Sequence, residues 1–152
     1  MWEWLSGLLD WTLILSHLRE LTLAYVLALP IAWDREVRER TAGLRTFPLV
    51  AVASCGYLLV GFEVLNSTEA EARVMAGLIT GMGFIGGGAI LKSGGQVRGT
   101  ATAASLWATG AIGLAVASHR YEIAIVITTI TFFTLRFLKP LVGKKSAKSD
   151  ST

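Results

Sequence analysis

Long apolar segments alternate with short charged stretches along most of the chain. Five such segments can be distinguished, and they span Leu18–Trp33, Thr46–Phe62, Val74–Leu91, Gly99–Ser118 and Tyr121–Leu138. A hydrocarbon layer about 30 Å thick is crossed by roughly 17–25 helical residues. The second, third and fourth segments meet this requirement by length. The first and fifth are shorter once the charged residues at their ends are excluded, and they require snorkelling of Arg19 and Arg136.

The composition favours lipid as the solvent of these segments. Apolar residue types make up 53% of the chain and charged types 16%, against about 25% charged in an ordinary soluble domain. Inside a bilayer each unsatisfied backbone group costs several kcal/mol, so a long apolar segment forms a helix even where it contains glycine. The sequence therefore predicts an all-α fold, a polytopic membrane helix bundle of about five transmembrane helices.

The two ends of the chain differ from this central part. Residues 1–17 are rich in tryptophan and leucine and predict an interfacial segment or the lead-in to the first span. Residues 18–139 form the transmembrane domain. Residues 140–152 contain Lys144, Lys145 and Lys148 among serines, which is typical of a disordered basic tail.

The basic residues predict the orientation of the bundle. Eleven lysines and arginines fall at the ends of the spans that face one side, and three fall at the other. Cytoplasmic loops carry the excess of positive charge. The N-terminus is therefore expected outside and the C-terminus in the cytoplasm, which agrees with an odd number of spans.

The third segment carries six glycines in eighteen residues. Such small residues let transmembrane helices approach closely, and the fourth segment has a matching stripe of small residues at Ala101, Ser105, Thr109, Gly113 and Ala117. We expect the two segments to pack as a hairpin, or the third to be partly unwound around a polar cavity. The predicted helix-packing residues are Gly77, Gly81, Gly83, Gly86, Gly87, Gly88, Ser105, Thr109 and Gly113.

A second group of candidate residues gathers at the predicted cytoplasmic ends of the spans. Charged groups buried there require partners, and Asp34 with Arg45 or Arg98 is the first pair to consider. The candidate functional cluster comprises Asp34, Arg35, Glu36, Arg45, Thr46, Arg98 and Thr102.

Several chemistries find no support in the sequence. The G-x-G-x-x-G pattern at 81–86 follows no predicted strand, so it is no nucleotide-binding fingerprint. Cys55 is the one cysteine and fits a packing role. No catalytic set, cofactor motif or nucleic-acid-binding stripe is evident, and metal ligands stay undefined. The absence of a carboxylate at the middle of a span counts against a cation pathway.

Four stretches identify a family resemblance. They are Asp34-Arg35-Glu36, Ala42-Gly43-Leu44-Arg45-Thr46, the glycine run from Gly81 to Ile90, and Val97-Arg98-Gly99 followed by the stretch Thr102 to Trp107. In this order and spacing they resemble the MgtC/SapB family of membrane proteins over most of residues 18–117.

The chain departs from the family pattern at two places. Ala32-Trp33-Asp34-Arg35 stands where the family usually has Gly-x-Glu-Arg, and Thr100-Ala101 replaces a leucine and a polar residue. The second departure removes a polar group from any contact made there. The chain also resembles a short form without the ACT-like domain that follows in many relatives.

The resemblance implies a non-enzymatic protein of the bacterial inner membrane, linked to magnesium limitation and to virulence or stress adaptation. It implies action through helix–helix contacts with membrane partners, with the F-type ATP synthase among the targets proposed for the family, or with a second copy of the chain. The alternative is a small Mg²⁺ transporter or channel.

Overall fold

The computed structural model describes residues 10–38, 42–93 and 96–138. In this part of the chain, each of the five predicted apolar segments is a helix. The helices and a short hairpin are α2 (Trp11–Arg38), α3 (Thr46–Val64), α4 (Thr68–Gly88), β1 (Leu91–Ser93), β2 (Gln96–Arg98), α5 (Thr100–Ala117) and α6 (Tyr121–Phe137). The predicted all-α helix bundle is confirmed.

The first helix is longer than its apolar segment. It begins at Trp11, so residues 11–17 continue directly into the first span. Asp10 precedes it and accepts a hydrogen bond from the backbone N–H of Thr12 at 2.9 Å, which satisfies one of the free donors at a helix start. The remainder of the predicted interfacial segment, residues 1–9, and the predicted tail at 140–152 lie outside the described residues.

Three helices are long and apolar enough to cross a membrane by length and composition: α2 over Trp11–Val37, α3 over Thr46–Val64 and α5 over Thr100–Ala117. Helix α4 is not among them, although its segment was expected to qualify by length. Glycines and the charged residues of its first turns lower its mean hydropathy. Helix α6 has 17 residues, within the range that can still span.

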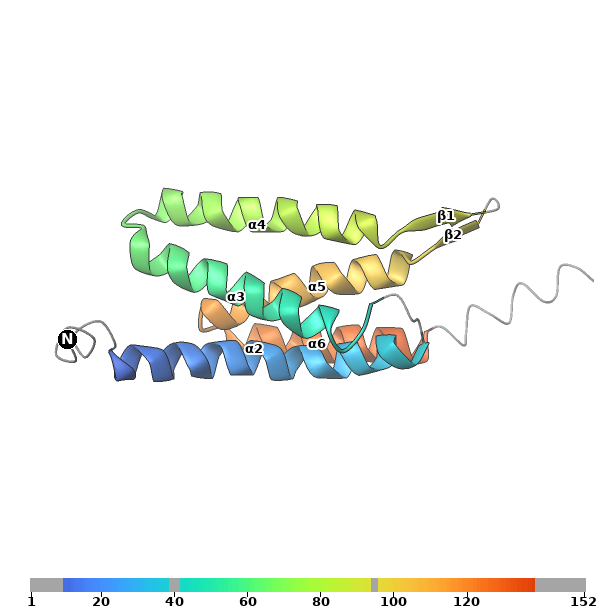
Figure 1. Ribbon diagram of the computed structural model, residues 1–152, viewed down its shortest axis with the longest axis horizontal. Coiled ribbons are helices and arrows are strands. Elements are labelled where there is room, and N and C mark those ends of the chain that lie inside the picture. Colours follow the sequence, from blue (N-terminus) through green and yellow to red (C-terminus); the bar gives the residue numbers. More distant parts are fainter. Residues whose placement is uncertain (1–9, 39–41, 94–95, 139–152) are drawn as a thin grey trace, which may run out of the picture.

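The helices run up and down along one long axis, with α4 at one side of the bundle, α2 at the other, and α3 and α5 between them (Figure 1). The antiparallel pair β1–β2 continues α4 into α5, with Leu91 opposite Arg98. Gly99 starts α5 with φ of 85°, and a Cβ there would meet the carbonyl oxygen of Ala89. Glycine is required at this position.

Helices α4 and α5, joined by β1–β2, pack against each other, but Gly113 in the small-residue stripe of α5 contacts α3. A Cβ at Gly113 would meet the carbonyl of Ala51 and would lie 2.8 Å from the Cβ of Ser54, both in α3. The α4–α5 contact uses a different face of α5, where Met82 packs over Gly110. The core therefore lies chiefly among α2, α3, α5 and α6, and α4 is attached along one edge.

Candidate functional site

A buried ion pair occupies the end of α2. Arg35 Nη2 lies 2.8 Å from Asp34 Oδ2, and both side chains are 1% exposed. Arg136 of α6 approaches the other carboxylate oxygen at 4.0 Å. The sequence placed Asp34 and Arg35 in the candidate cluster but expected Arg45 or Arg98 as the partner. The structure pairs Asp34 with the next residue of its own helix.

The other residues of the candidate cluster lie at the same end of the bundle in different environments. Glu36 accepts a hydrogen bond from the backbone N–H of Leu44 at 3.0 Å and so shapes the approach to α3. Arg45, before α3, and Arg98, in β2, are exposed, whereas Thr46 is half-buried and Thr102 is fully buried. The cluster therefore divides into a buried group and an exposed basic surface.

The glycines of α4 contact the rest of the chain at one position. A Cβ at Gly86 would lie 3.3 Å from the carbonyl oxygen of Ala103 in α5. Apart from the nearby backbone of α4 itself, no atom of the described residues lies within 4 Å of a Cβ built at any of the other five, which are Gly77, Gly81, Gly83, Gly87 and Gly88. The expected glycine packing within the chain is thus found at Gly86 alone. Helix α4 is continuous over its whole length, so the partly unwound alternative is wrong.

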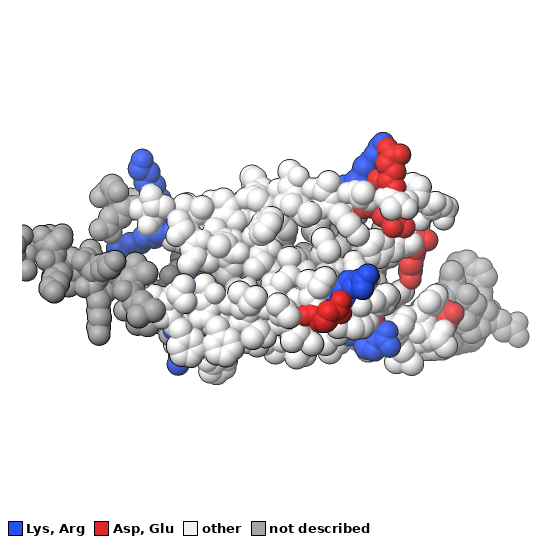
Figure 2. Space-filling model, turned by 180° about the vertical axis from the view of Figure 1, so that it is seen from behind, with Lys and Arg blue, Asp and Glu red and all other residues white. Residues whose placement is uncertain are grey.

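An apolar groove of about 980 Å³ runs between α3 and α4. Gly77 and Gly81 line its α4 side, and exposed Tyr57 and Phe84 lie along its margins. Arg45 is the one charged residue among its described lining. Figure 2 shows the molecule from behind, where most of the visible surface is uncharged, with charged side chains toward the ends and one further group of both signs nearer the middle.

The hydroxyl groups of the candidate residues Ser105 and Thr109 form hydrogen bonds within α5 itself. The hydroxyl of Ser105 donates to the carbonyl of Thr102 at 3.0 Å, and the hydroxyl of Thr109 donates to the carbonyl of Ser105 at 2.8 Å. Hydroxyls that bond to the preceding turn are common in helices and leave no group poised for chemistry. With Gly113, these residues serve the packing of α5.

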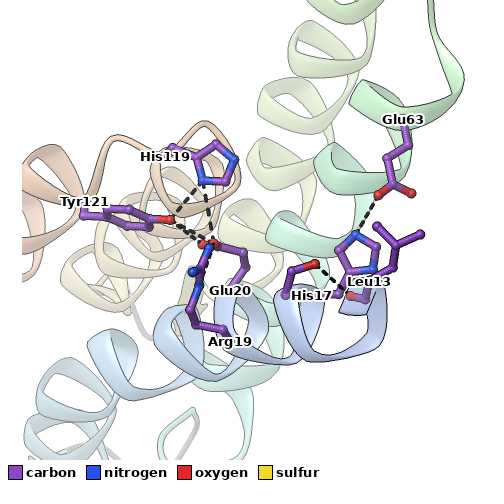
Figure 3. A network of polar contacts seen from close by, with 8 residues as sticks. Leu13, His17, Arg19, Glu20, Glu63, His119 and Tyr121 are labelled. Atoms are coloured by element: carbon purple, nitrogen blue, oxygen red, sulfur yellow. Dashed lines mark hydrogen bonds and ion pairs between the residues drawn. The ribbon is translucent and has the colours of Figure 1, made fainter. Parts of the chain in front are cut away.

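A second buried charge lies on α2, toward the opposite end of the bundle (Figure 3). Glu20 is 2% exposed and accepts hydrogen bonds from Arg19 Nη2 at 2.7 Å and from the Tyr121 hydroxyl at 2.8 Å. His119 Nδ1 lies 3.6 Å from Glu20. The sequence led us to expect no carboxylate at the middle of a span, whereas Glu20 lies inside α2, which begins at Trp11 and is long enough to span.

The sequence contained one signal for this network. Glu20 follows Arg19 inside an apolar helix, and a charge in that position calls for a partner. The partner Tyr121 is a hundred and one residues away, so no local pattern identifies it. Nearby, His17 Nε2 contacts Glu63 of α3 at 2.6 Å, which ties α2 to the end of α3.

The described residues contain no group of three or more His, Cys, Asp or Glu side chains placed to hold a metal ion. Both buried carboxylates already have an arginine within 2.8 Å. These two carboxylates therefore form internal ion pairs.

These features define a class of protein, a small polytopic membrane protein built as one antiparallel helix bundle with buried charge pairs. The sequence profile of the MgtC family matches residues 21–144. The chain belongs to this family, and the resemblance inferred from its motifs is confirmed.

Several relatives share the greater part of this chain. Protein MgtC of Brucella abortus is 36% identical over 119 residues, which cover 78% of this chain and 50% of the relative. Protein MgtC of Salmonella typhimurium is 34% identical over 118 residues, with the same two coverages. An uncharacterized protein of Synechocystis is 35% identical over 126 residues, 83% of this chain and 53% of its own. The chain thus spans about half the length of these relatives, and no solved structure matches it.

Proposed function

We propose that this MgtC-family protein acts without catalysis, by seating a transmembrane helix of another membrane protein in the groove between α3 and α4. The supporting observation is the bare backbone of Gly77 and Gly81 along that groove, where no other part of the described chain lies within 4 Å of a Cβ. Glycines four residues apart allow the backbones of two helices to approach in lipid. The adaptation to low magnesium, to virulence or to stress that the family resemblance implies, in the bacterial inner membrane, is part of this proposal.

The groove fits a helix of a particular kind. Its walls are apolar along most of their length, and Arg45 lies at the end where α3 begins. A partner helix with small residues facing Gly77 and Gly81 and with an acidic residue near Arg45 would match both the shape and the charge. The F-type ATP synthase and a second copy of this chain are the partners to test first.

Cation passage has weaker support. A pathway for Mg²⁺ needs oxygen ligands that are available to the ion, whereas Asp34 and Glu20 are each engaged by a neighbouring arginine. A metal flux into liposomes that depends on Asp34 would favour transport over helix binding.

The test uses two substitutions of the same kind on α4. Leu at position 81 (Gly81→Leu) fills the groove, whereas Gly83→Leu adds the same side chain about 200° away around the helix, at a site equally free of contacts. We expect Gly81→Leu to abolish crosslinking of the full chain to its membrane partners and Gly83→Leu to preserve it. Equal crosslinking by both variants, with normal insertion, would contradict the proposal.

A further inference from the structure

The turn between α5 and α6 has an unusual residue at its centre. His119 has φ of 55°, the left-handed conformation that glycine normally supplies at a helix end. Its N–H bonds to the carbonyl of Val116 at 2.9 Å, and the N–H of Arg120 bonds to that of Ala115 at 2.8 Å. These two bonds are those of a Schellman motif. The left-handed backbone conformation costs a histidine more free energy than it costs a glycine. We therefore expect the His119 side chain to have a role.

The imidazole of His119 is one end of a hydrogen-bonded chain that leads inward (Figure 3). Its Nδ1 lies 2.9 Å from the Tyr121 hydroxyl oxygen. That hydroxyl lies 2.8 and 3.0 Å from the two carboxylate oxygens of Glu20 and donates its one proton to them. Nδ1 must then be the donor to Tyr121. The imidazole is 64% exposed and the carboxylate 2% exposed, so the chain joins solvent to the interior.

We propose that His119, Tyr121 and Glu20 form a proton-responsive latch that holds the α5–α6 turn on α2. Because Nδ1–H is already used toward Tyr121, an incoming proton binds Nε2 and makes the ring a cation. That cation stands 3.6 Å from the Glu20 carboxylate, a separation at which opposite charges attract even where one of them is exposed. Acid therefore tightens the latch, and neutral pH loosens it.

The charged groups around the latch do not reverse the expected pH dependence, in which acid strengthens the contact between His119 and Glu20. Arg120, beside His119, is opposed by Glu122 at 4.0 Å. Arg19 binds Glu20 with its charged end largely exposed, where solvent screens its repulsion of the imidazolium. Toward the same end of the bundle, His17 of α2 is bonded to Glu63 of α3, and Cys55 of α3 is buried.

The chain has two histidines, which allows a sharp experiment. In a His17→Asn background, with any affinity tag removed, His119 is the one imidazole. The full chain in detergent micelles is unfolded thermally at several values between about pH 8 and about pH 5.5, the range in which histidine takes up a proton. We expect the melting temperature to rise toward acid by about 2–4 °C.

The matched control is the double variant His17→Asn/His119→Asn. Asparagine tolerates the left-handed conformation, so the turn is preserved while the proton-binding group is lost. Other carboxylates titrate equally in both proteins and cancel in the comparison. We expect the double variant, and also His17→Asn/Glu20→Gln, to lack the rise. A rise of equal size in the double variant, or none in the His17→Asn protein, would overturn the latch.

Discussion

Asp34 and Arg35 are consecutive residues of one helix and yet share a buried ion pair, with Arg35 Nη2 2.8 Å from Asp34 Oδ2. Neighbouring residues on a helix point about 100° apart and do not ordinarily face each other. Here both side chains turn into the interior, near the end of α6, where Arg136 also approaches the carboxylate. Both side chains are 1% exposed, so the pair is shielded from solvent.

Removing the arginine should therefore destabilise the bundle strongly. Arg35→Met removes the guanidinium that lies 2.8 Å from the buried Asp34 carboxylate, and breaking such a pair typically costs about 3–5 kcal/mol. Denaturant unfolding in detergent, followed by circular dichroism, measures the loss. Arg45→Met is the matched control, because Arg45 is exposed at the same end of the bundle, and it should change stability by less than about 0.5 kcal/mol. Equal losses in both variants would contradict the buried pair.

The positions of the helices were predictable because length and charge distribution decide them. The second helix begins at Thr46 and the fifth at Tyr121, as the sequence predicted. The burial of Glu20 was not predictable in the same way. Helix α2 starts at Trp11, well before the apolar segment, so a residue that marks the segment's edge lies within the helix and is buried by α6.

The sequence also could not predict which helix the small residues of α4 and α5 contact. Spacing by four residues places Gly77 and Gly81 on one side of α4, and it places Thr109 and Gly113 on one side of α5. It does not say which helix lies opposite. In the structure Gly113 of α5 meets α3, and a Cβ built at Gly77 or Gly81 meets no other described residue within 4 Å.

This difference predicts opposite responses to the same substitution. Gly113→Ala places a methyl group against the carbonyl of Ala51 and within 2.9 Å of the backbone nitrogen of Cys55, so it should cost about 1–3 kcal/mol of unfolding free energy. Gly77→Ala adds a methyl group to open space and should be neutral or stabilise by up to about 1 kcal/mol. Unfolding of the two detergent-solubilised variants, side by side, measures both. A tolerated Gly113→Ala would contradict the close α3–α5 contact.

The start of α2 predicts a pH dependence. The hydrogen bond from the Thr12 hydroxyl, followed by that from its backbone N–H, lowers the pKa of the Asp10 carboxyl below its usual value of 3.8. The Asp10 carboxylate therefore contributes its full stabilisation of the helix start at pH values above its usual pKa. This stabilisation is lost as the pH falls through the lowered pKa of the folded protein. An NMR titration of the Asp10 carboxyl should show a midpoint below 3.8. Thr12→Val removes the hydroxyl and should move the midpoint upward; an unchanged midpoint would refute the assigned cause.

The orientation of the bundle can be tested through its two ends. Asn66, in the turn before α4, and Val97, in the hairpin after it, are both exposed and lie at opposite ends of α4 (Figure 1). A Cys55→Ala parent has no thiol, so single cysteines can be introduced at either position. Because the basic residues cluster at the hairpin end, a membrane-impermeant thiol reagent should label Asn66→Cys in intact cells. Val97→Cys should react only after permeabilisation, and the reverse pattern would show that the charge bias does not set the topology.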